Sequence, residues 1–160
     1  QANGDSNQPE FSPADGTIAF RSDASNLVPD DTNSDADVFV KTPATGSIQI
    51  VSANAAGIQG NDSSYGPRWS PDGTRIAFES WAGNLVPGWP TGTVHLYVKT
   101  LADGAIQRIT VNPAGDTANS ESGDPAWSPD GTAIAFHSDA RNLVPGDTND
   151  TRDVFVKDIS

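Results

Sequence analysis

The feature that most constrains this chain is a repeat whose copies lie 58 residues apart. The repeat is clearest where an aromatic residue precedes Ser-Pro, at Phe11, Trp69 and Trp127. The same register continues through Ile-Ala-Phe at 18–20, 76–78 and 134–136, and through Asn-Leu-Val-Pro at 26–29, 84–87 and 142–145. Units that recur at a fixed period bury their apolar faces by stacking on one another. We therefore expect three similar units packed side by side.

Each unit has the residue pattern of four short strands and shows no helical periodicity. After the first strand, Ser70-Pro71-Asp72-Gly73 predicts a tight turn, because Pro fixes φ and Gly accepts the left-handed conformation. The next strands are expected at Arg75–Ser80, His95–Lys99 and Ile106–Thr110. The second strand is apolar on both faces, which is typical of a strand between two neighbouring sheets. The predicted fold class is all-β.

A longer motif carries a family resemblance. It reads Pro-x-Trp-Ser-Pro-Asp-Gly-Thr-x-Ile-Ala-Phe at 67–78 and 125–136, and Asp-Val-Phe-Val-Lys follows at 153–157. This motif resembles the TolB-type, or WD-like, β-propeller repeat, and the resemblance covers nearly the whole chain. It implies a single β-propeller segment over residues 1–160, with four-stranded blades at about 9–58, 67–116 and 125–160.

The phase of the repeat leaves the third blade incomplete. Gln1 corresponds to Gln59 and Ser160 to Ala44, so this blade is expected to lack its outer strand and to leave Asp153–Lys157 as an unpaired edge. Propellers of the resembled family usually close with six or more blades. We expect either half of a six-bladed ring, completed by a second copy in a homodimer, or a piece of a longer propeller.

Acidic and amide residues alternate in the long connection between the second and third strands. Oxygen donors at alternate positions of a tight loop can converge on calcium, which accepts six to eight oxygens. The predicted Ca²⁺ ligands are Asp31, Asn33, Asp35 and Asp37 in the first unit, and Asp147, Asn149 and Asp153 in the third. The second unit has Trp89, Thr91, Thr93 and His95 at the aligned positions, so its acids are lost together. The alternative interpretation is that these residues form Asx turns in a surface loop.

Composition narrows the classes of partner. The formal charge is -12, from 21 acidic and 9 basic residues, which repels nucleic acid and anionic lipid. No apolar run approaches the roughly 20 residues that cross a bilayer, so membrane insertion is not expected. Cysteine is absent, which leaves no disulfide framework. Calcium-holding loops favour a compartment rich in calcium, and the expected location is therefore secreted or periplasmic.

Three aromatic residues fall in connections rather than at core positions of strands: Tyr65, Trp81 and Trp89. Exposed aromatic rings can stack on sugars or anchor a protein partner. The alternative is local packing of the two tryptophans against Pro87 and Pro90. These three residues are the candidate ligand-binding set.

No catalytic motif is visible in the sequence. It contains no Gly-x-Ser-x-Gly and no His-Glu-x-x-His, and His95 and His137 are expected in packing or surface roles. The sequence therefore predicts a non-catalytic, calcium-stabilised binding or scaffolding module for a protein or glycan. Two alternatives stay open. One is the propeller part of a larger hydrolase, as in enzymes similar to prolyl oligopeptidase, and the other is a purely structural assembly unit.

Overall fold

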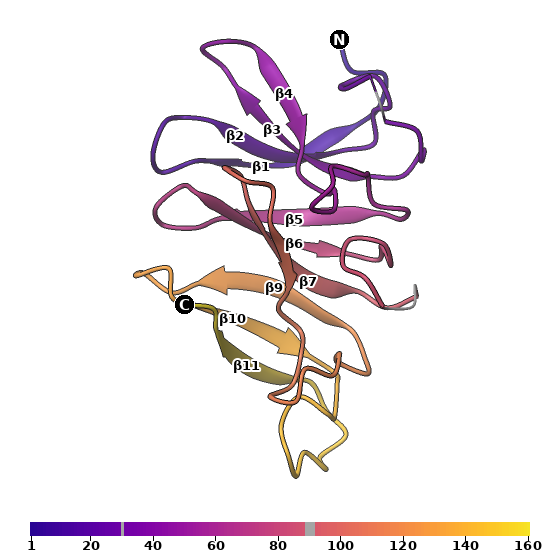
Figure 1. Ribbon diagram of the computed structural model, residues 1–160, viewed down its shortest axis with the longest axis vertical. Coiled ribbons are helices and arrows are strands. Elements are labelled where there is room, and N and C mark those ends of the chain that lie inside the picture. The colour runs from indigo at the N-terminus through magenta and orange to yellow at the C-terminus, as the bar shows by residue number, and fades with distance from the viewer. Residues whose placement is uncertain (30, 89–91) are drawn as a thin grey trace.

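The computed structural model describes residues 1–29, 31–88 and 92–160 and shows three antiparallel sheets stacked face to face (Figure 1). The first sheet contains β1 (Ser6–Phe11), β2 (Ile18–Ser22), β3 (Asp37–Thr42) and β4 (Ser47–Ile50). The second contains β5 (Ser64–Trp69), β6 (Arg75–Ser80), β7 (His95–Thr100) and β8 (Ile106–Arg108). The third contains β9 (Ser122–Trp127), β10 (Ala133–Ser138) and β11 (Asp153–Asp158). Within each sheet, strands that are neighbours in the sequence pair with each other.

The all-β prediction is confirmed, since the described part of the chain contains strands and turns but no helix. It accordingly holds no helix that could cross a membrane. The first strand of each sheet begins earlier than the blade boundaries predicted at residues 9, 67 and 125. These strands start at Ser6, Ser64 and Ser122. A register shift interrupts each of these strands next to a residue with positive φ. This β-bulge accommodates one extra residue in the first strand relative to the second.

The predicted turn after the first strand forms around a carboxylate. Asp72 Oδ1 accepts hydrogen bonds from Ser70 Oγ at 2.6 Å and from Thr74 N at 3.0 Å, and these bonds lower the pKa of Asp72 to about 2. Gly73 has a φ of 68°, which a residue with a side chain adopts only with strain. In the first sheet the corresponding turn is one residue longer, and β2 has 5 residues where β6 has 6.

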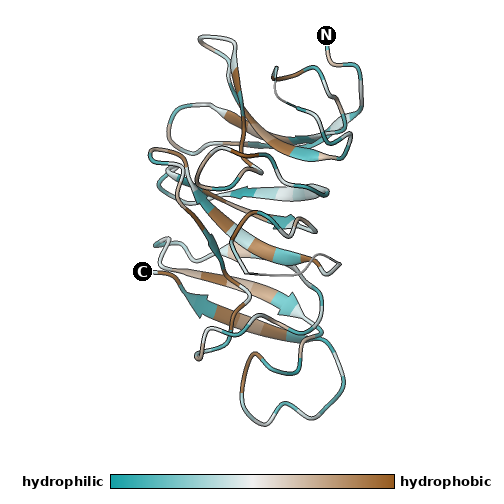
Figure 2. Cartoon of the chain, turned by 45° about the vertical axis from the view of Figure 1, so that its right-hand side comes forward, coloured by the Kyte–Doolittle hydropathy of each residue, from teal (hydrophilic) through white to brown (hydrophobic). Residues whose placement is uncertain are grey.

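Apolar side chains fill the two spaces between neighbouring sheets. Side chains alternate between the two faces of a strand, so β6 and β7 contribute to both spaces. The first core contains Ile76, Phe78 and Tyr97 of the second sheet with Ala19, Val38 and Val40 of the first. The second core contains Ala77, Leu96 and Val98 of the second sheet with Ile134 and Phe136 of the third. Figure 2 shows the hydrophobic stretches of the sheets lying mostly along the strands.

Tryptophans at the repeat position tie each sheet to the preceding one. Trp69 Nε1 donates to the carbonyl of Glu10 at 3.2 Å, and Trp127 Nε1 donates to the carbonyl of Arg68 at 3.0 Å. The Arg75 guanidinium also lies 4.8 Å from the centre of the Trp127 ring, which adds a cation–π contact. Trp69 and Trp127 therefore have a structural role at the contacts between sheets.

Within the described part of the chain, the outer faces of the first and third sheets have no neighbouring sheet. The third sheet ends at β11, and the described residues supply no fourth strand to it. Val154 and Val156 of β11 are 77% and 72% exposed. Phe11 at the other end of the stack is 70% exposed. The stack therefore presents apolar side chains at both ends.

Candidate functional site

The described candidate residues lie in the loops at one end of the sheets or in the strand ends beside these loops. In each sheet a long connection follows the second strand and leads to the third. The first strand begins at this same end, because its first residue pairs with the last residue of the second strand, as Ser64 does with Ser80. The acidic loops and the described candidate aromatic residues, Tyr65 and Trp81, therefore share one end of the molecule.

The acidic loop of the first sheet is capped by the side chain of Gln59. Its Nε2 donates to Asp31 Oδ1 at 2.8 Å and to Asp37 Oδ2 at 2.6 Å. Thr32 N donates to Gln59 Oε1 at 3.0 Å, which fixes the orientation of the amide. Two amide hydrogens consequently face the two carboxylates. In this arrangement the amide group of Gln59 offsets part of the repulsion between the two carboxylates.

Asp37 is fully buried beneath this cap. Ser52 Oγ donates to its Oδ1 at 2.5 Å. Burial raises the pKa of Asp37 to about 6, and the charge of Asp31 acts in the same direction. The hydrogen bonds from Ser52 and Gln59 lower the pKa but do not cancel these effects. The side chain of Asp37 is therefore shielded from solvent.

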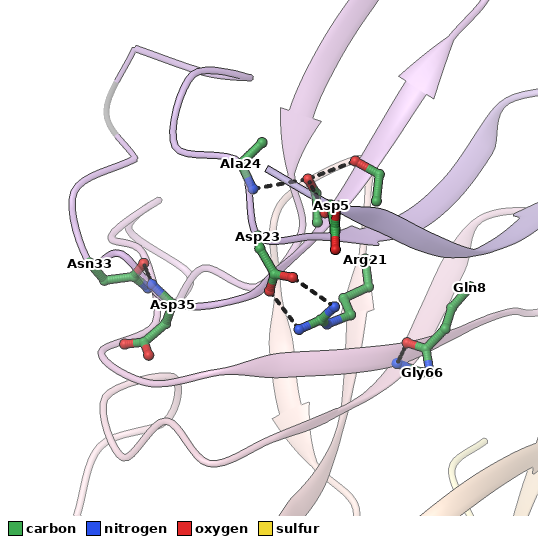
Figure 3. Close-up of polar contacts among 10 residues, drawn as sticks. Asp5, Gln8, Arg21, Asp23, Ala24, Asn33, Asp35 and Gly66 are labelled. Atoms are coloured by element: carbon green, nitrogen blue, oxygen red, sulfur yellow. Dashed lines mark hydrogen bonds and ion pairs between the residues drawn. The ribbon is translucent and has the colours of Figure 1, made fainter. Parts of the chain in front are cut away.

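The other two predicted ligands of this loop lie in an Asx turn. Asp35 N donates to Asn33 Oδ1 at 2.9 Å, as drawn in Figure 3. The Asn33 side chain also donates through Nδ2 to the carbonyl of Gly60 at 2.8 Å. The structure therefore joins Asp31 and Asp37 through one partner, while Asn33 stabilises the backbone of the loop.

The acidic loop of the third sheet has the same Asx turn but a different environment. Thr151 N donates to Asn149 Oδ1 at 3.1 Å, and Asn149 Nδ2 donates to Asp153 Oδ2 at 3.0 Å. Asp147, Asn149 and Asp153 line a surface cavity of about 450 Å³ beside Val154. The structure brings all three predicted ligands to this cavity. Across residues 1–29, 31–88 and 92–160, however, no group of three or more His, Cys, Asp or Glu side chains is arranged to hold a metal.

The second sheet replaces the buried acid with histidine. His95 Nδ1 lies 3.1 Å from Thr110 Oγ1, in the place where Asp37 contacts Ser52 in the first sheet. Burial and the neighbouring Arg108 lower the pKa of His95 to about 4, so its ring is neutral at physiological pH. His95 has a packing role, as expected. The candidate residue Trp89 lies outside the described residues.

The other two candidate aromatic residues are in direct contact. Trp81 Nε1 donates to the Tyr65 hydroxyl at 3.0 Å. Tyr65 lies in β5 opposite Glu79 of β6, so its predicted place in a connection is wrong, because the β-bulge lets the first strand begin earlier. Trp81 directly follows β6. Both side chains are partly exposed. The structure therefore forms a hydrogen-bonded Tyr65–Trp81 pair, which we call the aromatic pair.

Carboxylates surround the aromatic pair. Burial raises the pKa of Tyr65, and the negative charges of Glu79, Glu121 and Asp62 raise it further. Glu79 Oε1 accepts a hydrogen bond from Asp124 N of the third sheet at 2.9 Å. A ring face for stacking next to hydrogen-bond acceptors can hold a ligand that carries hydroxyl groups or a positive charge.

Comparisons with known proteins identify the fold. No protein-family model and no curated protein sequence matches the chain. Among solved structures, the chain is similar to an acylaminoacyl peptidase of Pyrococcus horikoshii, with a TM-score of 0.55 and 16% identity. It is also similar to a hydrazine synthase of Kuenenia stuttgartiensis (TM-score 0.51, 18% identity) and to an oligogalacturonate lyase in complex with manganese (TM-score 0.50, 14% identity). These are propeller-type proteins. The chain has a propeller-type fold.

The similarity covers most of this chain but only part of each solved protein. It includes 89%, 84% and 92% of this propeller segment, and 18%, 37% and 35% of the peptidase, the synthase and the lyase. The chain thus spans less than two fifths of the length of each. At these identities the similarity establishes the fold alone.

Sequence reasoning missed Gln59, which organises the first acidic loop of the propeller. The signal was present in the repeat. Gln59 follows the unit that has the acids, whereas its counterpart Thr117 follows the unit that lacks them. A search for residues that change together with the acids would have found it.

Proposed function

We propose that this chain is a non-catalytic part of a TolB-type propeller whose aromatic pair binds a ligand. The observation that carries the proposal is the hydrogen bond between Trp81 Nε1 and the Tyr65 hydroxyl. It holds two partly exposed rings in a fixed arrangement at the loop end of the second sheet. Rings that are already ordered lose little conformational freedom when a ligand stacks on them.

The surroundings of the pair favour a glycan or a basic segment of a protein. Glu79, Glu121 and Asp62 place negative charge near the Tyr65 hydroxyl. Such carboxylates accept hydrogen bonds from sugar hydroxyls and attract lysine or arginine side chains. An acidic or phosphorylated ligand would be repelled at this surface.

Exchange of Trp81 for the residue that the other two units use tests this proposal. Asp23 and Asp139 occupy the aligned positions, so Trp81→Asp is compatible with the fold of the repeat. Binding of neutral oligosaccharides and of a lysine-rich peptide would be measured by calorimetry. We expect the variant to bind at least about tenfold more weakly than the wild type. If the wild type binds neither class of probe, or if the variant binds equally well, the aromatic pair is not the site.

We also propose that calcium binds the acidic loop of the third sheet in a secreted or periplasmic setting. Support comes from the shared cavity of Asp147, Asn149 and Asp153, where no glutamine among the described residues caps the acids as Gln59 does in the first sheet. Bound calcium would raise folding stability by mass action. The melting temperature of the wild type should fall when chelator is added, whereas that of a variant with Asp147→Asn and Asp153→Asn should not. Equilibrium dialysis without calcium uptake would contradict this proposal.

A second candidate function is the propeller part of a larger hydrolase. The alignment of 89% of this chain with only 18% of an acylaminoacyl peptidase favours this alternative. In that case the propeller would control access to a catalytic domain elsewhere. The mass and sequence of the natural full-length protein decide between the two candidates, since a hydrolase requires a further domain with a nucleophile and its base.

A further inference from the structure

The residues around Gln1 take the same place on the first sheet that the residues around Gln59 take on the second. Asn26 Nδ2 donates to the Gln1 carbonyl at 3.0 Å, and Asn3 N donates to Asn26 Oδ1 at 3.0 Å. The matching bonds run from Asn84 Nδ2 to the Gln59 carbonyl at 2.9 Å and from Asn61 N to Asn84 Oδ1 at 3.0 Å. Gln1 therefore occupies the position on the first sheet that Gln59, which links two sheets, occupies on the second.

From the equivalent position on the second sheet, the Gln59 side chain contacts the preceding sheet, which is the first. It caps the acids of that sheet, Asp31 and Asp37. Thr117 occupies the equivalent position on the third sheet, where Asn142 Nδ2 donates to its carbonyl at 2.8 Å. The sheet that precedes Thr117 has His95 in place of the acid. Glutamine thus follows the sheet with acids, and threonine follows the sheet without them.

The third sheet has the acids but no glutamine cap among the described residues. Asp147 and Asp153 border an open cavity. On the same sheet, Val154 and Val156 are 77% and 72% exposed. Their counterparts in the first sheet, Val38 and Val40, are buried in the core shared with the second sheet. The third sheet therefore presents the surface that accepts a following sheet.

The first sheet presents the matching surface. Ile18 and Phe20 align with Ile76 and Phe78, the residues with which the second sheet packs on the first. Phe11 aligns with Trp69 and is 70% exposed. The two end surfaces of the chain are thus complementary in the way that two internal contacts already demonstrate.

We propose that a second copy of this chain packs its first sheet on the third sheet of the first copy, and that Gln1 of the second copy caps Asp147 and Asp153. The proposal rests on the propeller stacking assumed in the proposed function. A two-fold axis would form this contact twice and close a ring of six sheets. In this arrangement the partner copy completes the acidic loop of the third sheet, as Gln59 completes that of the first sheet within one chain.

The contact between copies is expected to be weaker than the contacts within one chain. Phe11 has no indole N–H, so it cannot donate to the carbonyl of the preceding sheet as Trp69 and Trp127 do. Calcium and Gln1 would also compete for the same carboxylates. Calcium should therefore shift the equilibrium from dimer to monomer.

Light scattering and sedimentation equilibrium test the assembly. One chain has a mass of 16.7 kDa, so a closed ring should have twice that mass. Gln1→Glu places a third carboxylate against Asp147 and Asp153 and should raise the dimer dissociation constant at least about tenfold. Gln107→Glu, an exposed change on β8, is the matched control and should leave the constant unchanged.

A compensating variant tests the named contact. Adding Asp153→Asn to Gln1→Glu removes part of the repulsion and should recover most of the lost affinity. A wild type that stays monomeric at roughly millimolar concentration, the range of weak complexes, would overturn the proposal. So would a Gln1→Glu variant that dimerises as the wild type does.

The two proposals fail separately. Ligand binding by the aromatic pair is measured with Trp81→Asp, whose residue lies on the second sheet away from both end surfaces. A monomer that binds ligand refutes the dimer alone. A dimer that binds no ligand refutes the binding function alone.

Discussion

Asp37 and His95 occupy the same position in successive sheets, and burial acts on their pKa values in opposite directions. Burial raises the pKa of Asp37 to about 6 and lowers that of His95 to about 4. In both residues the neutral form gains, because a buried charge loses its hydration. The two side chains have similar partners, Ser52 and Thr110, at the start of the connection after the fourth strand. One structural position thus accommodates an acid or a base, provided that its charge is shielded or removed.

Asp37→Asn should alter the pH dependence of stability. The pKa of Asp37 is higher in the folded state than its ordinary value of 3.8, so its stabilising contribution is present below about pH 3.8 and is lost as the pH rises through about 6. Asparagine cannot ionise. Relative to the wild type, the variant should therefore gain about 2 to 3 kcal/mol in free energy of unfolding between pH 4 and pH 7. Urea unfolding at pH 4 and pH 7 measures the difference in free energy of unfolding between the variant and the wild type. The same difference at both pH values would contradict the raised pKa of Asp37.

At the scale of strands and loops, local chemistry made the fold predictable. The Ser70-Pro71-Asp72-Gly73 turn and the apolar strand Arg75–Ser80 appear in the structure as the sequence indicated. The acidic loops were less predictable. Their residues were found, but Gln59 contacts Asp31 across 28 positions of the sequence, and such distant contacts leave no local pattern. The aromatic pair likewise depends on the pairing of β5 with β6, which brings Tyr65 to Trp81.

Trp127→Phe tests how tryptophan joins neighbouring sheets. Phenylalanine stands at the aligned position of the first sheet, so the change suits the repeat, but it removes the bond from Trp127 Nε1 to the Arg68 carbonyl. It also weakens the contact with Arg75. We expect a loss of about 1 to 2 kcal/mol in the free energy of unfolding. Chemical denaturation measures the loss, and Phe11→Trp, in which the new ring meets no preceding sheet within the chain, is the control. Equal stability of Trp127→Phe and the wild type would refute this role.

At the scale of the whole molecule, the three sheets are stable as a stack because the second sheet, which lies between the other two, is apolar on both faces. Val98 of the second sheet is 2% exposed, while the aligned Val156 of the third is 72% exposed. The same residue at the same position of the repeat is therefore buried or exposed solely according to whether another sheet follows. This difference in exposure arises from the arrangement of the units and not from the sequence of any single unit.

Matched substitutions at Val98 and Val156 test which of the two side chains is buried within one chain. Val98→Asp places an unpaired charge in the core between the second and third sheets, and we expect it to unfold the protein at room temperature. Val156→Asp should change the free energy of unfolding of the monomer by less than about 0.5 kcal/mol. Circular dichroism during urea titration distinguishes the two. Similar destabilisation by both substitutions would mean that the outer face of the third sheet is already covered within the chain.

Contacts between methyl groups and aromatic rings, measured by nuclear Overhauser spectroscopy, test the stacking of repeated sheets most directly. The account predicts cross-peaks from Val38 and Val40 to Phe78 and Tyr97, which lie in different sheets but share the first core. It likewise predicts cross-peaks from Leu96 to Phe136 in the second core. A spectrum in which these side chains contact only residues of their own sheets would contradict it.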